Sequence, residues 1–116
     1  MLGKFKIIRK KLSYVFGATG TSSSQTYSIN GLVKQVHLRV PNFTNAITAG
    51  FDVADENEYV IYSTTGRAKN ANHNITDMVI PLAGANTVTA TLSGNAGGAG
   101  GTVVIVITYW GWETGY

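Results

Sequence analysis

Hydrophobic and polar residues alternate along most of this chain with a period of two, the period of a half-buried β-strand. The clearest runs cover residues 32–40, 47–53 and 87–93. In the first run, Lys34 is the one polar residue in the inward phase, and Pro41 ends the strand by removing a backbone donor. We expect the inward face of that run to consist of Leu32, Val36, Leu38 and Val40. Further strands are expected at residues 25–30, 59–63, 75–82 and 102–110.

Glycine and other turn-forming residues separate these runs. Asn30-Gly31 is a strong hairpin-turn signal, residues 66–74 form a polar stretch that predicts a long loop, and residues 94–101 predict a wide hairpin loop with positive φ angles. No segment has the apolar spacing of a capped helix. Short strands at this spacing predict an all-β fold, an antiparallel, jelly-roll-like β-sandwich. The last run is apolar on both faces, so we expect it to be a central strand or part of a subunit contact.

The charge is unevenly distributed, and this changes the predicted domain organisation. Five of the nine basic residues lie in the first eleven positions, and a stretch rich in Gly, Ser and Thr follows at residues 17–24. We therefore predict an extended basic N-terminal arm with a linker over residues 1–24 and a β-sandwich domain over residues 25–116. Removal of residues 1–16 is expected to leave the sandwich folded.

The composition excludes several classes of function. The chain has 116 residues, enough for one domain, and no cysteine, so it has no disulfide, thiolate metal site or cysteine nucleophile. Only 13% of the residues are charged, about half the usual share, which predicts a surface that other subunits cover. The longest apolar run, Val103–Ile107, is too short to span a membrane.

The candidate chemical motifs do not combine into an active site. The glycine-rich stretch lacks the lysine of a phosphate-binding loop and leads into a strand. His37 and His73 have no neighbour in sequence that suggests a triad or a metal cluster. Four acids surround one predicted turn, but their spacing matches no standard calcium loop. These are Asp52, Asp55, Glu56 and Glu58. We therefore expect no enzymatic activity, no cofactor, no metal and no small-molecule substrate.

Two segments are candidates for protein contacts. In the basic arm, large apolar residues alternate with cations, which favours an anchored strand over a solvated tail and makes nucleic acid a less favoured partner. At the other end, aromatic residues of a type enriched at binding hot spots gather around the last strand. The predicted interface residues are Phe5, Ile7, Ile8, Arg9, Lys10, Lys11, Leu12, Trp110, Trp112 and Tyr116.

From Ser28 to Tyr109, the order of the motifs resembles the small β-sandwich virion proteins of tailed bacteriophages. The residues that carry the resemblance are Ile29-Asn30-Gly31-Leu32-Val33, Val40-Pro41, the segments 48–53 and 59–63, Pro81-Leu82-Ala83-Gly84, the segment 87–94 and Gly100-Gly101-Thr102. Proteins of this type decorate or cement capsids, or attach at the head–tail region, as homo-oligomers. The resemblance does not include the basic arm or the aromatic end.

The resemblance implies a structural protein on the capsid surface of a virion, present in the host cytoplasm during assembly. Its partners would be the major capsid protein or other virion proteins, and copies of itself in a dimer or trimer. One alternative is a tail, baseplate or head–tail component with the same fold. Another is a carbohydrate-binding module that uses Trp110, Trp112 and the acidic turn.

Overall fold

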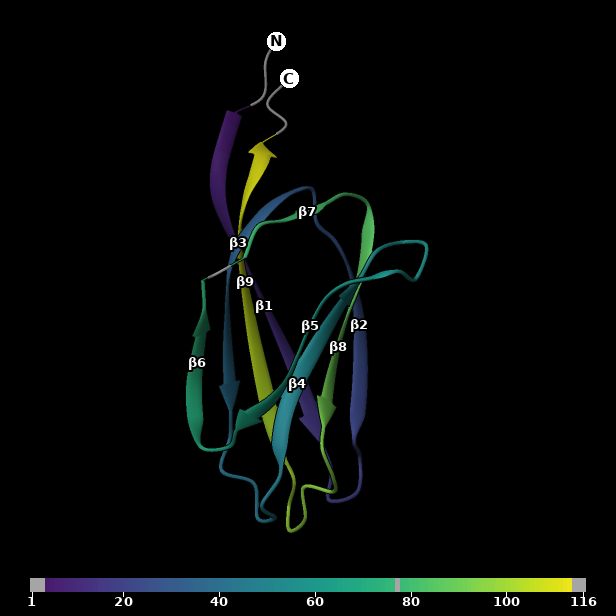
Figure 1. Ribbon diagram of the computed structural model, residues 1–116, viewed down its shortest axis with the longest axis vertical. Helices are drawn as coiled ribbons and strands as arrows, with labels where there is room; N and C mark the ends of the chain where they lie inside the picture. The colour runs from purple at the N-terminus through teal and green to yellow at the C-terminus, as the bar shows by residue number, and fades with distance from the viewer. Residues whose placement is uncertain (1–3, 77, 114–116) are drawn as a thin grey trace.

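The protein, described here by a computed structural model over residues 4–76 and 78–113, is built from strands arranged in two antiparallel sheets that face each other (Figure 1). The side chains of residues 4, 5, 112 and 113 lie outside the description. Sheet A contains β1 (Lys4–Phe16), β9 (Gly101–Glu113), β3 (Gly31–Val40) and β6 (Ala71–Ile75) in that order, with β7 (Ile80–Leu82) also paired to β3. Sheet B contains β2 (Ser22–Ser28), β8 (Ala85–Leu92), β4 (Thr48–Ala54) and β5 (Val60–Ala68) in that order.

The order of the strands is that of a jelly roll. β1 to β4 alternate between the two sheets, and β8 and β9 lie in different sheets, next to strands that are distant in sequence. The predicted jelly-roll-like sandwich is confirmed, and the last strand, β9, is central, between β1 and β3. The two predicted hairpins at Asn30-Gly31 and residues 94–101 are wrong, because both segments cross from sheet B to sheet A. The positive φ angles of the second loop are present at Gly97, Gly98 and Gly100.

Strand β1 corrects the predicted boundary between a basic arm and a separate sandwich. It pairs with β9 in unbroken register from Lys4↔Glu113 to Phe16↔Gly101. Leu12 and Tyr14 are both fully buried in the core. Residues 4–24 are therefore part of the sandwich. The physical reason is the alternation itself, which puts Leu12, Tyr14 and Phe16 on the inner side of β1 and Arg9 and Lys11 on its outer side.

Tyr14 also connects the two sheets through a hydrogen bond. Its hydroxyl donates a hydrogen bond to the backbone oxygen of Val88 in β8, at 2.8 Å. Burial of the ring raises the pKa of the Tyr14 phenol far above its usual value. At the edge of the same strand, the Gln25 side-chain amide donates to the Ser13 carbonyl at 2.6 Å. These contacts fix β1 against sheet B as well as against β9.

A β-bulge in β3 changes which residues face the core. The pairing of β3 with β9 shifts between Val33 and Gln35, so that the exposed Lys34 is the extra residue. Val33 is therefore buried, and Leu32, predicted to face inward, lies on the outer face. The exceptional phase of Lys34 in the sequence is the signal of this bulge. Val36, Leu38 and Val40 face the core as predicted.

The polar stretch at residues 66–74, predicted as a loop, forms the end of β5 and most of β6. A tight turn joins the two strands, with Asn70 at a φ of 54°. Among the described residues of the predicted strand at 75–82, only Ile75 and β7 are in strand conformation. Alternation was weak here because β6 and β7 lie at the edge of sheet A, where polar residues are tolerated.

Two glycines allow close packing at one end of sheet A. Gly31 and Gly111 face each other across β3 and β9, and a Cβ atom on Gly31 would lie 2.2 Å from the Trp110 carbonyl oxygen. Beyond Gly111, β9 pairs only with β1, and Figure 1 shows the resulting two-stranded ribbon extending past the rest of the sheet. The described residues include no helix that is long and apolar enough to cross a membrane.

Candidate protein-interaction surface

The outer face of sheet A carries a row of apolar side chains that crosses four strands. In the register of the sheet, Trp110 of β9 lies opposite Ile7 of β1 on one side and Leu32 of β3 on the other. Leu32 in turn lies opposite Pro81 of β7. Residues directly opposite each other in antiparallel strands share a face, so these four side chains lie together. Ile7 is 60% exposed and Trp110 is 49% exposed. We call Ile7, Trp110, Leu32 and Pro81 the apolar row.

Next to the apolar row, the same face is basic. Arg9 lies opposite Thr108, and Lys11 lies opposite Val106. On the far side of β9, Val106 and Val104 lie opposite His37 and Arg39 of β3. The side chains of Arg9 and Lys11 form no hydrogen bond or ion pair with another described residue. We call Arg9, Lys11, His37 and Arg39 the basic face.

Amide side chains hold the β3 side of the basic face in place. The Asn72 side-chain oxygen lies 3.2 Å from Arg39 Nη1, which donates to it, and 3.4 Å from His37 Nε2. The Gln35 amide donates to the Asn74 side-chain oxygen at 2.5 Å. These bonds link β3 to β6 and restrict the side chains that a partner would meet, which lowers the entropy cost of binding.

The acids whose side chains the structure describes lie elsewhere. Asp52, Asp55, Glu56 and Glu58 all belong to β4 or to the turn between β4 and β5, in sheet B. The Asp55 carboxylate accepts hydrogen bonds from the backbone of Asn57 and Tyr59, at 2.9 and 3.0 Å. Across the described residues, no three His, Cys, Asp or Glu side chains form a group that could hold a metal ion. The fold thus separates a basic side from an acidic turn.

Four of the ten predicted interface residues lie together on the outer face of sheet A. They are Ile7, Arg9, Lys11 and Trp110. Leu12 is wrong as an interface residue, because it is fully buried inside the chain's own core. Ile8 is partly buried against the core, and the Lys10 ammonium lies 5.3 Å from the centre of the Tyr27 ring.

Three predicted residues cannot be placed. The Phe5 and Trp112 side chains lie outside the description, although the backbones of the two residues are paired. Tyr116 also lies outside the described residues. The last strand is predicted to end at residue 110, but β9 continues to Glu113. Tyr109, Trp110 and Trp112 are part of β9, and Tyr109 is buried.

Sequence reasoning missed the contribution of β3 and β7 to this surface. Leu32 is predicted to face the core, and the predicted interface residues do not include Pro81, His37 or Arg39. The outward phase of His37 and Arg39 was visible in the alternation. Their proximity to the N-terminal cations was not, because it depends on β9 lying between β1 and β3.

The outer face of sheet B has a different character, because hydroxyl groups cover it. The Ser24 and Thr89 hydroxyls lie 2.7 Å apart across β2 and β8, and those of Thr26 and Thr87 lie 3.2 Å apart. These hydroxyls bind each other in pairs. Over β2 and β8, the face therefore offers a neighbouring protein neither charge nor a large apolar group. The one acid described on this face, Asp52 of β4, lies opposite Thr89 and accepts a hydrogen bond from the Ser63 hydroxyl at 2.6 Å.

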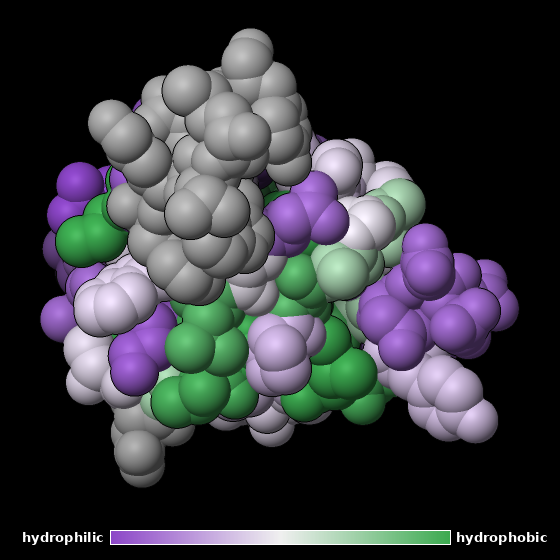
Figure 2. Space-filling view, turned by 90° about the horizontal axis from the view of Figure 1, so that it is seen from above, coloured by the Kyte–Doolittle hydropathy of each residue, from purple (hydrophilic) through white to green (hydrophobic). Residues whose placement is uncertain are grey.

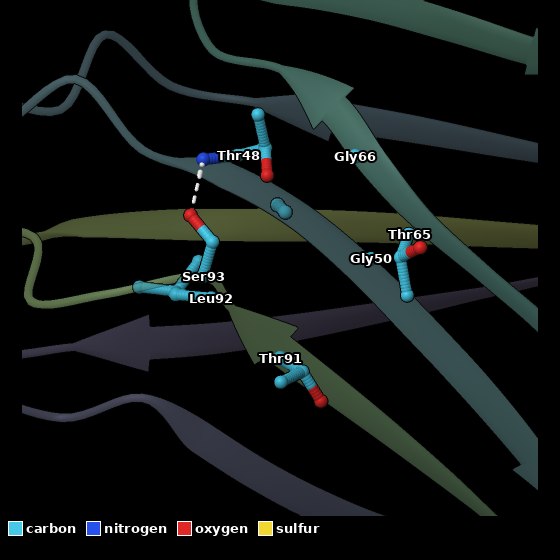
Figure 3. Close-up of a pocket in the computed structure, with 8 residues that line it drawn as sticks. Thr48, Gly50, Thr65, Gly66, Thr91, Leu92 and Ser93 are labelled. Carbon is cyan, nitrogen blue, oxygen red and sulfur yellow. Dashed lines mark hydrogen bonds between the residues drawn. The ribbon is translucent and has the colours of Figure 1, made fainter.

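Sheet B also has a shallow pocket, located over Gly50 (Figure 3). The pocket is bounded by β4, β5 and the end of β8, and the Thr48 backbone N–H donates to the Ser93 hydroxyl at its rim, at 2.9 Å. Gly50 is required here, because a Cβ atom would lie 2.1 Å from the Thr64 carbonyl oxygen. The lining consists of Thr48, Ala49, Gly50, Thr65, Gly66, Thr91, Leu92 and Ser93, so it contains no acid–base group.

No protein-family model and no curated protein sequence matches this chain. Among solved structures, the fold is similar to that of a protein from Bacillus endospore appendages, which are disulfide-linked pili. The TM-score is 0.52 at 15% identity, and the match covers 96% of this chain and 94% of the other.

Two further structures match with lower scores. TmCBM61, solved in complex with β-1,4-galactotriose, gives a TM-score of 0.49 at 12% identity, covering 94% of this chain and 88% of the other. A chain of the Gt strain of infectious bursal disease virus gives 0.44 at 10% identity, covering 91% of this chain and 32% of the other. The first match, at 15% identity, shows a shared β-sandwich fold.

Proposed function

We propose that this chain is a structural protein of a virion, of the capsid-decoration or cement type found in tailed bacteriophages. The proposal rests mainly on one observation, the apolar row bordered by the basic face on the outside of sheet A. An exposed Trp110 flanked by Ile7 and Leu32 is the kind of cluster that forms the centre of a protein interface. Arg9 and Lys11 beside it, whose side chains have no partner among the described residues, fit an acidic neighbour.

The mechanism is binding without a chemical step. A protein that binds only the assembled shell stabilises that state by mass action, and the stabilisation grows with the concentration of the protein. The apolar row would supply buried area and slow dissociation. The cations would steer encounter and fix the orientation on an acidic surface of the major capsid protein or another virion protein.

A carbohydrate-binding role is less well supported. A sugar platform needs polar groups around the aromatic ring for the sugar hydroxyls. Trp110 instead has aliphatic neighbours, and the acidic turn that was grouped with it belongs to the other sheet.

Co-sedimentation tests the proposal. Virus heads and, separately, tails lacking this protein are mixed with wild-type chain or with Trp110→Ala. Truncation of a hot-spot residue costs roughly 2 kcal/mol, so we expect about a thirtyfold weaker attachment for the variant. Thr89→Ala, on the hydroxyl-covered face, is the matched control and should attach like wild type.

Binding to heads supports a decoration protein, whereas binding to tails alone would make it a tail or baseplate component. Equal attachment of Trp110→Ala and wild type would contradict the proposed interface. Binding to glycans and not to any virion part would favour the carbohydrate-binding alternative.

A further inference from the structure

The turn between β4 and β5 projects from sheet B and combines acids with exposed apolar residues. Figure 1 shows this turn standing out from the sandwich, and in Figure 2 it forms the hydrophilic projection at the right. Directly after the acids, Tyr59 is 72% exposed, Val60 57% and Ile61 40%. We call this segment the acidic knob. It consists of Asp55, Glu56, Glu58, Tyr59, Val60 and Ile61.

The acidic knob has a defined shape before it meets a partner. The backbones of Asp55 and Tyr59 are joined by an N–H···O bond of 2.9 Å, and the Asp55 carboxylate accepts two further backbone bonds inside the turn. Glu58 has a φ of 67°, which the turn stabilises. A bulge at Ile61, where the pairing with β4 shifts, ends the regular strand. A preformed turn loses little entropy on binding.

The acidic knob and the outer face of sheet A are complementary in two respects. The knob combines negative charge with exposed apolar side chains, and sheet A combines Arg9, Lys11 and Arg39 with the apolar row. None of the acids whose side chains the structure describes lies on sheet A, and the knob contains no basic residue. Both halves of a matched contact are therefore present on one chain.

We propose that the acidic knob of one copy binds the apolar row and basic face of a second copy. This inference rests on the proposed function, because it names the partner of the same surface. The two halves are different surfaces on different sheets, so copies join either head to tail or as a reciprocal pair in which each knob binds sheet A of the other copy. A head-to-tail contact is not self-limiting, and it produces a ring if the rotation closes or a chain if it does not.

Pairing of sheet edges is a less favourable route to the same assembly. The outer edge of β5 is interrupted by two bulges in its pairing with β4. At the edge of β1, the Ser13 carbonyl oxygen already accepts a hydrogen bond from the Gln25 side-chain amide. Bulges and capped edges are how natural sheets prevent strand addition.

Charge exchange tests the inference, with sedimentation velocity as the readout. One variant carries Arg9→Glu and Lys11→Glu, a second carries Glu56→Lys and Glu58→Lys, and a third carries all four changes. We expect wild type to self-associate and each two-site variant to do so at least about tenfold more weakly. The four-site variant should regain association, because its charges are again opposite across the contact.

The four-site variant is also the control for net charge, which equals that of wild type because the two pairs of changes cancel. All four side chains are exposed, so melting curves should show folded protein in every case. A wild type that stays monomeric at all concentrations would overturn the inference. So would two-site variants that associate like wild type, or a folded four-site variant that does not.

Attachment to virus particles separates this inference from the proposed function. If wild type is monomeric but Arg9→Glu/Lys11→Glu loses attachment to particles, the contact between copies is wrong and the virion interface stands. If the same variant loses self-association but attaches to particles normally, the virion interface on sheet A is wrong and the contact between copies stands.

Discussion

The two sides of strand β1 have opposite surroundings, although their residues alternate along one strand. On the inner side, Leu12 and Tyr14 are completely buried. On the outer side, Ile7, Arg9 and Lys11 are exposed beside β9. Strand β1, which the sequence predicts to be a separable basic arm, is thus part of the core and also part of the candidate interface on sheet A. The comparison predicts that changes on the inner side reduce stability and that changes on the outer side reduce association.

Removal of residues 1–16 should have the largest effect. It takes Leu12, Tyr14 and Phe16 out of the core and exposes the whole edge of β9. We expect the remaining chain to lose cooperative unfolding, measured by circular dichroism during heating, because the core loses three buried side chains and β9 becomes an edge strand with a row of unpaired backbone groups. The control is Ile7→Ser/Arg9→Ser/Lys11→Ser, which leaves the inner side intact. A truncated chain that melts cooperatively would restore the view of a separable arm.

Leu12→Ala should lower the free energy of unfolding by about 2–5 kcal/mol, the range for truncating a buried leucine. Ile7→Ala, five residues earlier on the outer side, should change it by less than about 1 kcal/mol, because the side chain is mostly exposed. Urea denaturation of both variants measures the difference. Similar losses for the two variants would show that the sides of β1 do not differ as described.

Tyr14→Phe should cost about 1 kcal/mol through the lost hydrogen bond to Val88, and it should change the response to alkali. The pKa of the Tyr14 phenol is raised above its ordinary value of 10.0. Because the phenol releases its proton more easily in the unfolded chain, the stability that depends on the neutral phenol is complete below pH 10 and is lost as the pH rises above 10. Wild type should therefore lose stability above about pH 10, and Tyr14→Phe should lose less. Identical alkaline melting profiles would contradict a buried neutral phenol.

Arg9→Ser/Lys11→Ser should have the smallest effect on stability, within about 0.5 kcal/mol, because neither side chain bonds to another described residue. The same variant should bind its partner more weakly at low salt than wild type does, and the difference should shrink as salt screens the charges. Titration of binding against ionic strength measures this. A difference that does not change with salt would mean that the cations do not act by charge.

The sequence by itself determined the fold class and most strand positions, because alternation reports which side chains of one strand share a face. It also identified Trp110, Arg9 and Lys11 as candidates for contacts. It did not show which strands are neighbours. Alternation is a local property of one strand, whereas the pairing of strands depends on how the two sheets bury their faces together. A turn such as Asn30-Gly31 therefore has the same local signal whether it closes a hairpin or crosses between sheets.

Only the tertiary structure decided that β9 lies between β1 and β3. That placement made the supposed arm part of the core and brought Arg39 beside the N-terminal cations. The bulge at Lys34 then turned Leu32 to the outside, next to Trp110. Each of these outcomes depends on contacts between residues far apart in the chain, and such contacts become favourable only when the whole sandwich forms.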